Sequence, residues 1–435
     1  MFNFVKFLKT IPPYSYGICL LGMISGMTFN LISFTIPYNL AEAKYSSTFV
    51  GLIFLTSLPY CLKPILAPFI DKYSIPFLCK RLGHRRGWAI AIQVCLLISI
   101  SVFLIIEPTY NPLITIIVMP VISLCAALQD IVLDAYRIEH AKTEQDLSLI
   151  STFSITGFRI GMLIGSAGGL YISNILNWHY VYLCAFVVIL LGPIIILHVT
   201  EPRILKRKTA TSLLSSTEYL QVIKDSFRLL KIKNPKWFLI ILFILLYKSS
   251  DTVPAAMSSL VLIDLSFTTT EIAGISKAYG LLLMIMGGAI AGIITAKVGI
   301  VKSVFICGIF QLMSPLMFAI LSIMGNNILI MFLTITLQNF TSGLGGTALV
   351  IYFSILCDKQ LVATQFSIIS SFSSFSRILL SFLSGVAASY VDWTTFFIFN
   401  ILISAIFIPI FLLIYNLTNG MDHHDLQNEK QMLIF

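Results

Sequence analysis

Eight ionisable side chains lie inside long apolar stretches of the sequence, where a charge is costly. On insertion scales each costs about 2.5–3.5 kcal/mol at the centre of a bilayer, so such a residue persists when it pairs with another charge or lines an aqueous cavity. In these positions cations can bind anions, and acids can exchange protons. The eight residues are Lys63, Asp130, Asp134, Arg159, Lys248, Asp251, Lys277 and Arg377.

Two groups of charges have helical spacing. Asp130, Asp134 and Arg137 are spaced i, i+4 and i+7, so they share one face of a helix. A position near the helix end explains Arg137 and Asp134, but it explains the deeper Asp130 poorly. Lys248 and Asp251 are spaced i, i+3 and can neutralise each other within one helix. This pair is either a structural ion pair or a site for protons or substrate.

Arg159 and Arg377 have no acidic partner at helical spacing in their own segments. Because arginine keeps its proton, each must meet a carboxylate, a backbone carbonyl or a bound anion. Five embedded cations face three embedded acids, so the set carries an excess of two positive charges. This excess favours an anionic ligand, and the alternative is that the two arginines only tie helices together.

The elements that must position these charges are membrane-spanning helices. The 435 residues are 57% hydrophobic and only 11% charged, about half the charged fraction of soluble domains. A helix needs about 20 apolar residues to cross a bilayer. The sequence predicts an all-α membrane protein with about twelve spans, near residues 14–38, 48–70, 87–106, 111–133, 148–172, 178–198, 237–262, 269–295, 300–324, 327–352, 362–390 and 393–416.

The spans divide into two related sets of six. Arg159 precedes an aromatic segment that begins at Trp178, and Arg377 likewise precedes Trp393. Two six-helix repeats joined by a long loop are typical of the major facilitator fold. We expect an N-terminal half, a basic linker, a C-terminal half and a tail, at residues 1–200, 201–236, 237–416 and 417–435.

The distribution of positive charge predicts the orientation. Lysine and arginine gather in alternate loops, and the opposite side holds only Lys44, so both termini are expected in the cytoplasm. This topology explains the net charge of +9 without nucleic acid, for which no binding motif is present. Within the linker, residues 216–230 are either an amphipathic helix on the inner leaflet or a solvated basic segment.

Other chemistry finds little support. The eight cysteines form no CxxC, no phosphate-binding GxxxxGK[ST] occurs, and the histidines are scattered. The Asp422–Asp425 segment could bind a metal, but a frayed terminus is the better interpretation. We expect no cofactor and no metal site. A membrane-embedded transferase and an inactive paralogue remain as rivals. The glycine-rich Ser342–Gly346 segment predicts a helix bend or a close ligand contact.

A set of motifs and single residues runs along the whole chain. They are Lys63, Pro68, Asp71, GHRRGW at 83–88, QDIVLDAYR at 129–137, GFRIGML at 157–163, LYKSSD at 246–251, Lys277, Gly280, QNFTSG at 338–343, ATQF at 363–366 and Arg377. The loop motif GHRRGW indicates only the facilitator superfamily, whereas QDIVLDAYR and LYK-x-x-D are more specific. Taken together, these positions resemble those of the AmpG-type muropeptide permeases.

The resemblance implies proton-driven import of anhydro-muropeptides from periplasm to cytoplasm, through the bacterial inner membrane, by a protein that we expect to be a monomer. Gln338 stands where the family often has glutamate, which removes one titratable group. Another bulky anion, such as an acyl-CoA, is the alternative substrate. We expect substrate binding at Arg159, Lys248, Lys277, Gln338 and Arg377, proton coupling at Asp130, Asp134 and Asp251, and gating at Lys63, Asp71, Arg85, Arg86 and Arg137.

Overall fold

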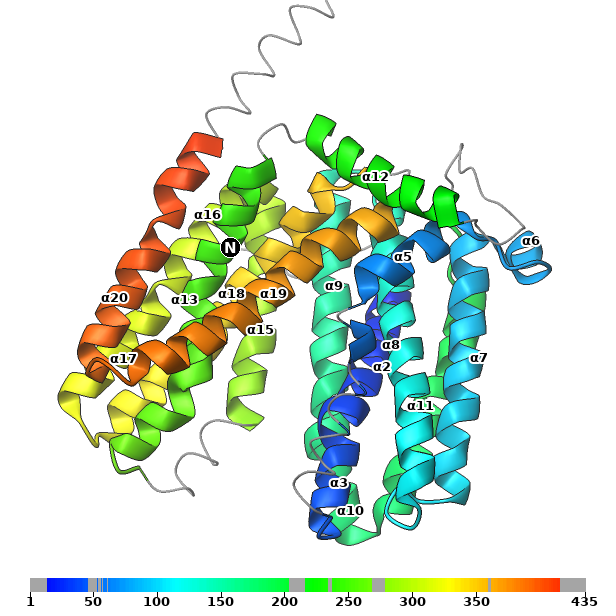
Figure 1. Cartoon of the computed structure of the whole chain (residues 1–435), viewed down its shortest axis with the longest axis horizontal. Coiled ribbons are helices and arrows are strands. Elements are labelled where there is room, and N and C mark those ends of the chain that lie inside the picture. The colour runs from blue at the N-terminus through cyan, green and yellow to red at the C-terminus, as the bar shows by residue number, and fades with distance from the viewer. Residues whose placement is uncertain are drawn as a thin grey trace, which may run out of the picture.

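The computed structural model describes residues 14–45, 53, 56, 58–60, 62–202, 216–233, 237–267, 278–358 and 361–414. Within these ranges, eleven helical segments are long and apolar enough to cross a membrane. The span expected near residues 48–70 lies partly outside the described residues, and its regular part is a short helix, α5 (Lys63–Lys72). The helices form two bundles that lie side by side (Figure 1).

The N-terminal half holds the helices that precede residue 200. The first and fifth spans each contain a π-helical turn between two α-helices. The remaining elements of this half are α2 (Tyr14–Asn30), η1 (Leu31–Thr35), α3 (Ile36–Glu42), η2 (Leu58–Tyr60), α6 (Leu78–Leu82), α7 (His84–Ile105), α8 (Pro112–His140), α9 (Glu144–Leu163), η3 (Ile164–Gly168), α10 (Gly169–Ile175) and α11 (Trp178–His198).

The C-terminal half follows the linker helix α12 (Ser216–Lys233). Its third span is interrupted at Leu312, where α16 passes into α17. The helices of this half are α13 (Trp237–Asp264), α15 (Ala278–Val298), α16 (Ile300–Gln311), α17 (Met313–Met324), α18 (Ile328–Leu356), α19 (Val362–Ala388) and α20 (Trp393–Ala405).

Corresponding helices in the two halves begin with the same kind of side-chain cap. The Asn111 side chain caps α8 by accepting hydrogen bonds from the backbone N–H groups of the second and third residues after it, and Asn327 caps α18 in the same way. Both capped helices are 29 residues long. Asp392 caps α20 by accepting a hydrogen bond from the backbone N–H of Thr395. This hydrogen bond lowers the pKa of the Asp392 carboxyl. α8 and α18 are therefore corresponding helices of an internal repeat.

A tryptophan–carboxylate contact is also repeated. Trp178, at the start of α11, donates its indole N–H to Glu42 at the end of α3, over 2.7 Å. Trp393, at the start of α20, donates to Asp264 at the end of α13, over 2.9 Å. Each contact pins the end of the first span in its half to the start of the sixth, at the matching place predicted from Trp178 and Trp393.

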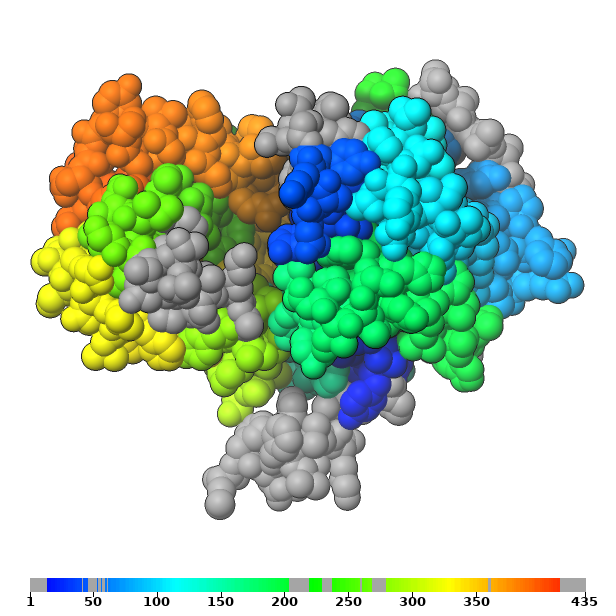
Figure 2. All heavy atoms as spheres, turned by 90° about the horizontal axis from the view of Figure 1, so that it is seen from below, coloured from blue at the N-terminus to red at the C-terminus, as the bar shows by residue number. Residues whose placement is uncertain are grey.

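The halves meet at one end of the bundle and diverge at the other. α12 lies across the end that holds Lys72, His84, His140 and Glu144, which we call the linker end (Figure 1). α5 and α8 pack against α19, and α9 packs against α15 and α18. From the opposite end, the halves are separated by a recess between the two lobes (Figure 2).

Glycines allow the closest helix contacts in the N-terminal half. A Cβ added at Gly161 of α9 would lie 1.9 Å from the carbonyl oxygen of Met23 in α2. The clash is with backbone, so no side-chain movement can remove it. We expect Gly161→Ala to cost about 3 kcal/mol by overpacking. Thermal unfolding in detergent measures this. The matched control is Gly385→Ala in α19, where nothing lies within 4 Å and alanine is expected to be neutral or stabilising. Equal melting temperatures for the two variants would contradict the packing argument.

The glycine-rich segment of α18 stays helical. α18 runs unbroken from Ile328 to Leu356, through the Ser342–Gly346 segment. A Cβ at Gly343 would lie 2.1 Å from the carbonyl oxygen of Met284, and one at Gly345 would lie 2.2 Å from the Gln311 side chain. These glycines instead let α15 and α16 pack closely against α18, which offsets their low helix propensity.

Candidate functional site

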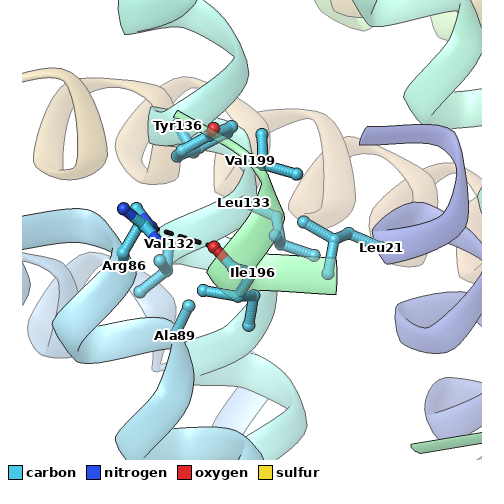
Figure 3. Close-up of a pocket in the computed structure, with 8 residues that line it drawn as sticks. All are labelled: Leu21, Arg86, Ala89, Val132, Leu133, Tyr136, Ile196 and Val199. Atoms are coloured by element: carbon cyan, nitrogen blue, oxygen red, sulfur yellow. Dashed lines mark hydrogen bonds between the residues drawn. The ribbon is translucent and has the colours of Figure 1, made fainter. Parts of the chain in front are cut away.

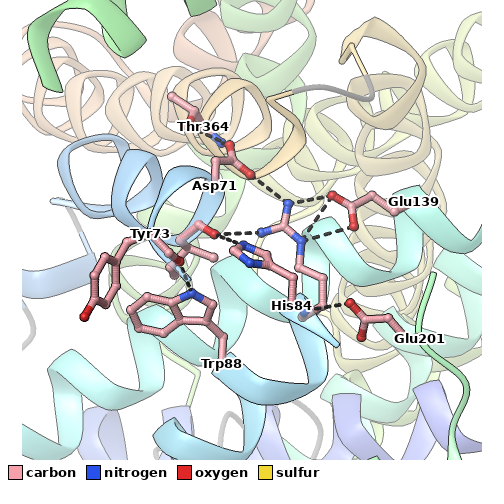
Figure 4. A network of polar contacts seen from close by, with 9 residues as sticks. Asp71, Tyr73, His84, Trp88, Glu139, Glu201 and Thr364 are labelled. Carbon is pink, nitrogen blue, oxygen red and sulfur yellow. Dashed lines mark hydrogen bonds and ion pairs between the residues drawn. The ribbon is translucent and has the colours of Figure 1, made fainter. Parts of the chain in front are cut away.

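A buried ion network lies at the linker end of the N-terminal half (Figure 4). Arg85 is completely buried and donates to Asp71 over 2.7 Å and to Glu139 over 2.5 Å. The ring nitrogen Nε2 of His84 contacts the carbonyl oxygen of Ile70 at 2.6 Å. Three charged side chains from α5, α7 and α8 therefore satisfy one another away from water, which holds the ends of these helices together.

The same network reaches across to the C-terminal half. The free carboxylate oxygen of Asp71 accepts hydrogen bonds from the backbone N–H and the hydroxyl of Thr364, at 2.8 and 2.7 Å. Thr364 lies in the first turn of α19, where unpaired N–H groups attract an anion. Asp71 thus joins Arg85 of one half to α19 of the other.

Arg86 and Glu201 fasten the neighbouring helix ends. Glu201 accepts hydrogen bonds from the backbone N–H groups of Arg85 and Arg86, at 2.8 and 3.0 Å, and so caps α7. Arg86 donates to the last-turn carbonyls of α11 at Ile196 and Leu197. A small cavity beside it is lined by apolar side chains such as Leu133, with the Arg86 guanidinium at one edge (Figure 3). Apart from Arg86 and Tyr136, the residues that line it are apolar.

Arg137 forms a second bridge between the halves. It is buried, pairs with Asp134 at 3.0 Å, and donates to Ser151 and, across the interface, to Ser354 of α18 at 3.0 Å. Its guanidinium also lies 4.9 Å from the ring centre of Phe366 in α19. The predicted shared face of α8 therefore carries Asp134 and Arg137 as a pair.

Asp130 takes a different partner. Lys63, at the start of α5, donates to its carboxylate over 2.8 Å, and Ser25 of α2 makes a short hydrogen bond to the same group. The Lys63 ammonium also lies 4.8 Å from the ring centre of Tyr60. The Lys63 and Asp130 side chains keep 18% and 14% of their surface exposed. The pair is therefore shielded but within reach of water.

Arg159 points from α9 into the C-terminal half. Its guanidinium donates to the carbonyl oxygens of Met284 in α15, at 2.7 Å, and Gly343 in α18, at 3.4 Å. A Cβ at Gly288 would lie 2.2 Å from its Nη1, so the glycine makes room for the arginine. Of the partners predicted for Arg159, the structure supplies backbone carbonyls in direct contact, and the Asp251 carboxylate lies near enough to interact with its charge.

Lys248 and Asp251 pair within α13, as their spacing predicted. The ammonium lies 3.0 Å from the carboxylate, and the two side chains are 15% and 14% exposed. The Ser342 side chain of α18 lies beside Asp251. Gln338 lies one turn before Ser342 in α18 and is 8% exposed. These residues come from the first and fourth spans of the C-terminal half.

The other predicted site residues lie apart. Arg377 is exposed in α19, and Lys277 lies outside the described residues. Sequence reasoning assigned no role to Glu139, Glu201 and Ser25, and it noted Thr364 only as part of the ATQF motif. Each is the polar partner of a residue that was singled out, and no spacing in the sequence connects the partners. Among the described residues, no group of three His, Cys, Asp or Glu could hold a metal ion.

Comparison with known proteins places most of the chain in one family. The Major Facilitator Superfamily model matches residues 18–379. A Rickettsia typhi protein named "Putative transporter AmpG 3" is 52% identical over 92% of this chain and 95% of the relative. The Rickettsia prowazekii protein of the same name is also 52% identical, over 92% of this chain and 96% of the relative.

Solved structures agree on the fold. The Escherichia coli fucose:proton symporter FucP has a TM-score of 0.69 at 13% identity, over 92% of this chain and 98% of that one. The human organic anion transporter MFSD10 has a TM-score of 0.66 at 13% identity, over 93% of this chain and 100% of that one. The chain is a multi-pass membrane transporter that belongs to the AmpG-type permeases of the major facilitator superfamily.

Proposed function

We propose that this protein imports anhydro-muropeptides into the cytoplasm across a bacterial inner membrane, driven by protons. The observation that carries the proposal is the 52% identity, over nearly the whole chain, to relatives named for AmpG transport. The cationic excess of the embedded charges supports it, because muropeptides carry peptide carboxylates. The two halves rock about the central cleft, as in other facilitators.

The linker end is the cytoplasmic end in this proposal. The positive-inside distribution supports that orientation, with both termini inside. The bridges from Asp71 to Thr364 and from Arg137 to Ser354 then close the cytoplasmic side, and the recess faces the periplasm. The conformation is one that receives substrate. The gating set Lys63, Asp71, Arg85, Arg86 and Arg137 acts with Glu139 and Glu201 as the cytoplasmic latch.

Substrate carboxylates bind to cations that remain accessible. Arg377 is exposed, and Lys248, which pairs with Asp251, keeps part of its surface exposed. Lys277 and Gln338 complete the proposed binding set. Arg159 already binds two backbone carbonyls, so it meets substrate only when the halves move apart at this point.

Protons act at carboxylates that are each held by a cation. Protonation of Asp130 frees Lys63, and protonation of Asp251 frees Lys248, because a neutral acid holds a cation weakly. Asp134, paired with Arg137 at the latch, links a proton to opening of the cytoplasmic end. Gln338 cannot titrate, so the coupling does not pass through that position.

Binding to purified protein tests the substrate class. We expect anhydro-muropeptide to raise the melting temperature in detergent, and an analogue with amidated peptide carboxylates to raise it much less. An equal shift for both ligands would remove the carboxylate argument. A shift with an acyl-CoA and none with the muropeptide would move the assignment to another bulky anion.

A mutant cycle separates the roles of Lys248 and Asp251. If the charges chiefly neutralise each other, Lys248→Ala leaves Asp251 uncompensated and impairs transport more than Lys248→Ala combined with Asp251→Asn. Initial uptake rates in proteoliposomes, normalised to folded protein, measure the difference. Equal loss in the single and double variants would count against a purely structural pair and assign at least one charge to substrate or protons.

A further inference from the structure

Arg159 and Arg377 occupy the same register in corresponding helices. α9 begins at Glu144 and α19 at Val362, so each arginine comes fifteen residues after the first residue of its helix. α9 packs on α15 and α18 of the opposite half, and α19 packs on α5 and α8 of the opposite half. Each arginine therefore lies at the same place along a helix that packs against the fourth span of the other half.

Gly346 of α18, which lies near Arg159, corresponds to an acidic residue in the N-terminal half. A Cβ on Gly346 of α18 would lie 3.7 Å from Nη2 of Arg159. Gly346 is the nineteenth residue of α18, counted from Ile328, and the nineteenth residue of α8, counted from Pro112, is Asp130. Because the caps of these helices match, Asp130 corresponds in the repeat to the glycine that Arg159 meets, and its partners in this conformation are Lys63 and Ser25.

Arg377 is accessible and lies on the polar side of α19. It is exposed, whereas Arg159 is 9% exposed. Ser370, Ser373 and Ser374 precede it at i−7, i−4 and i−3 and so lie on its side of α19. The strongly exposed apolar side chains of this stretch, Phe375, Ile378 and Phe382, do not share that spacing. Arg377 therefore belongs to the polar side of the helix and not to its lipid-facing side.

We propose that Arg377 is the alternate partner of Asp130 and replaces Lys63 when the halves close at the end opposite the linker. The inference rests on the alternating access of the proposed function, but not on the identity of the substrate. In the present conformation Lys63 holds Asp130, and Arg377 is free to take a substrate carboxylate. On closure, the Asp130 carboxylate competes for the guanidinium and displaces the substrate toward the linker end, while Lys63 is released.

Irreversible cross-linking of engineered cysteines tests this exchange. In protein whose native cysteines are replaced, Asp130→Cys with Arg377→Cys is treated in liposomes with a bifunctional thiol reagent about as long as an arginine side chain. The product accumulates even if the closed state is rare. The reference pair, Arg159→Cys with Gly346→Cys, reports the contact seen in this structure. The specificity pair, Asp130→Cys with Ile378→Cys, replaces Arg377 by its neighbour on another side of α19.

We expect the reference pair to cross-link at once, the 130–377 pair to cross-link more slowly to near completion, and the 130–378 pair to remain at least tenfold slower. A 130–377 rate no greater than the 130–378 rate overturns the proposal. Failure of the reference pair also overturns it, because the register argument depends on that contact. No substrate is needed, so absence of muropeptide transport would leave these rates, and the inference, unaffected.

Discussion

Arg85→Gln is expected to open the linker end and to lower the melting temperature more than any other single substitution in the gating set. The change leaves Asp71 and Glu139, which are both buried beside Arg85, without their cation. Removing one partner of a buried charge pair costs about 3–5 kcal/mol. The loss falls on the conformation that is closed at this end, because Asp71 also holds Thr364 of the other half.

Thermal unfolding and thiol accessibility measure the two effects separately. A cysteine at Ser354, which is buried at the interface beside Arg137, should react with a polar maleimide at least tenfold faster in the Arg85→Gln background. Arg81→Gln is the matched control, because Arg81 lies in the same region but is exposed. If Arg85→Gln behaves like Arg81→Gln in both measurements, the buried network does not close the linker end.

Arg159→Gln is expected to have the second largest effect, and Arg377→Gln is its control from the internal repeat. Arg159 donates charged hydrogen bonds to Met284 and Gly343 across the interface, and hydrogen bonds to charged groups contribute about 1.5–3 kcal/mol each. We expect a destabilisation of about 2–4 kcal/mol by thermal unfolding. Arg377 is exposed, so its replacement should change stability by less than about 0.5 kcal/mol.

Transport would respond differently from stability. Both substitutions are expected to reduce uptake, Arg159→Gln by loosening the halves and Arg377→Gln by removing a proposed binding cation. If Arg377→Gln is as unstable as Arg159→Gln, the two arginines contribute equally to stability. That result would contradict the claim that Arg159 on α9 joins the halves whereas Arg377 on α19 does not.

The local contacts of the site follow from the sequence. Lys248 and Asp251 pair because a helix places residues i and i+3 side by side. The pair could therefore be predicted once the segment was recognised as a helix. The same spacing gives the pair of Asp134 and Arg137. The matching places of Arg159 and Arg377 are likewise visible, because corresponding helices of a repeat keep their register.

The long-range contacts do not follow from spacing. Lys63 and Asp130 are separated by 67 residues and Asp71 and Thr364 by 293, so only the packing of whole helices brings them together. Gly343 shows the same limit. Its low helix propensity suggested a bend, but its role in close packing depends on Met284 of α15, and the sequence of α18 does not reveal that neighbour.

Uptake of radiolabelled anhydro-muropeptide into proteoliposomes, with and without an inward proton gradient, tests the central claim most directly. We predict uptake that rises with the gradient and falls when Asp130→Asn replaces the native protein. Uptake that ignores the gradient would keep the substrate and remove the proton coupling. No uptake by vesicles that contain folded protein would contradict the muropeptide assignment.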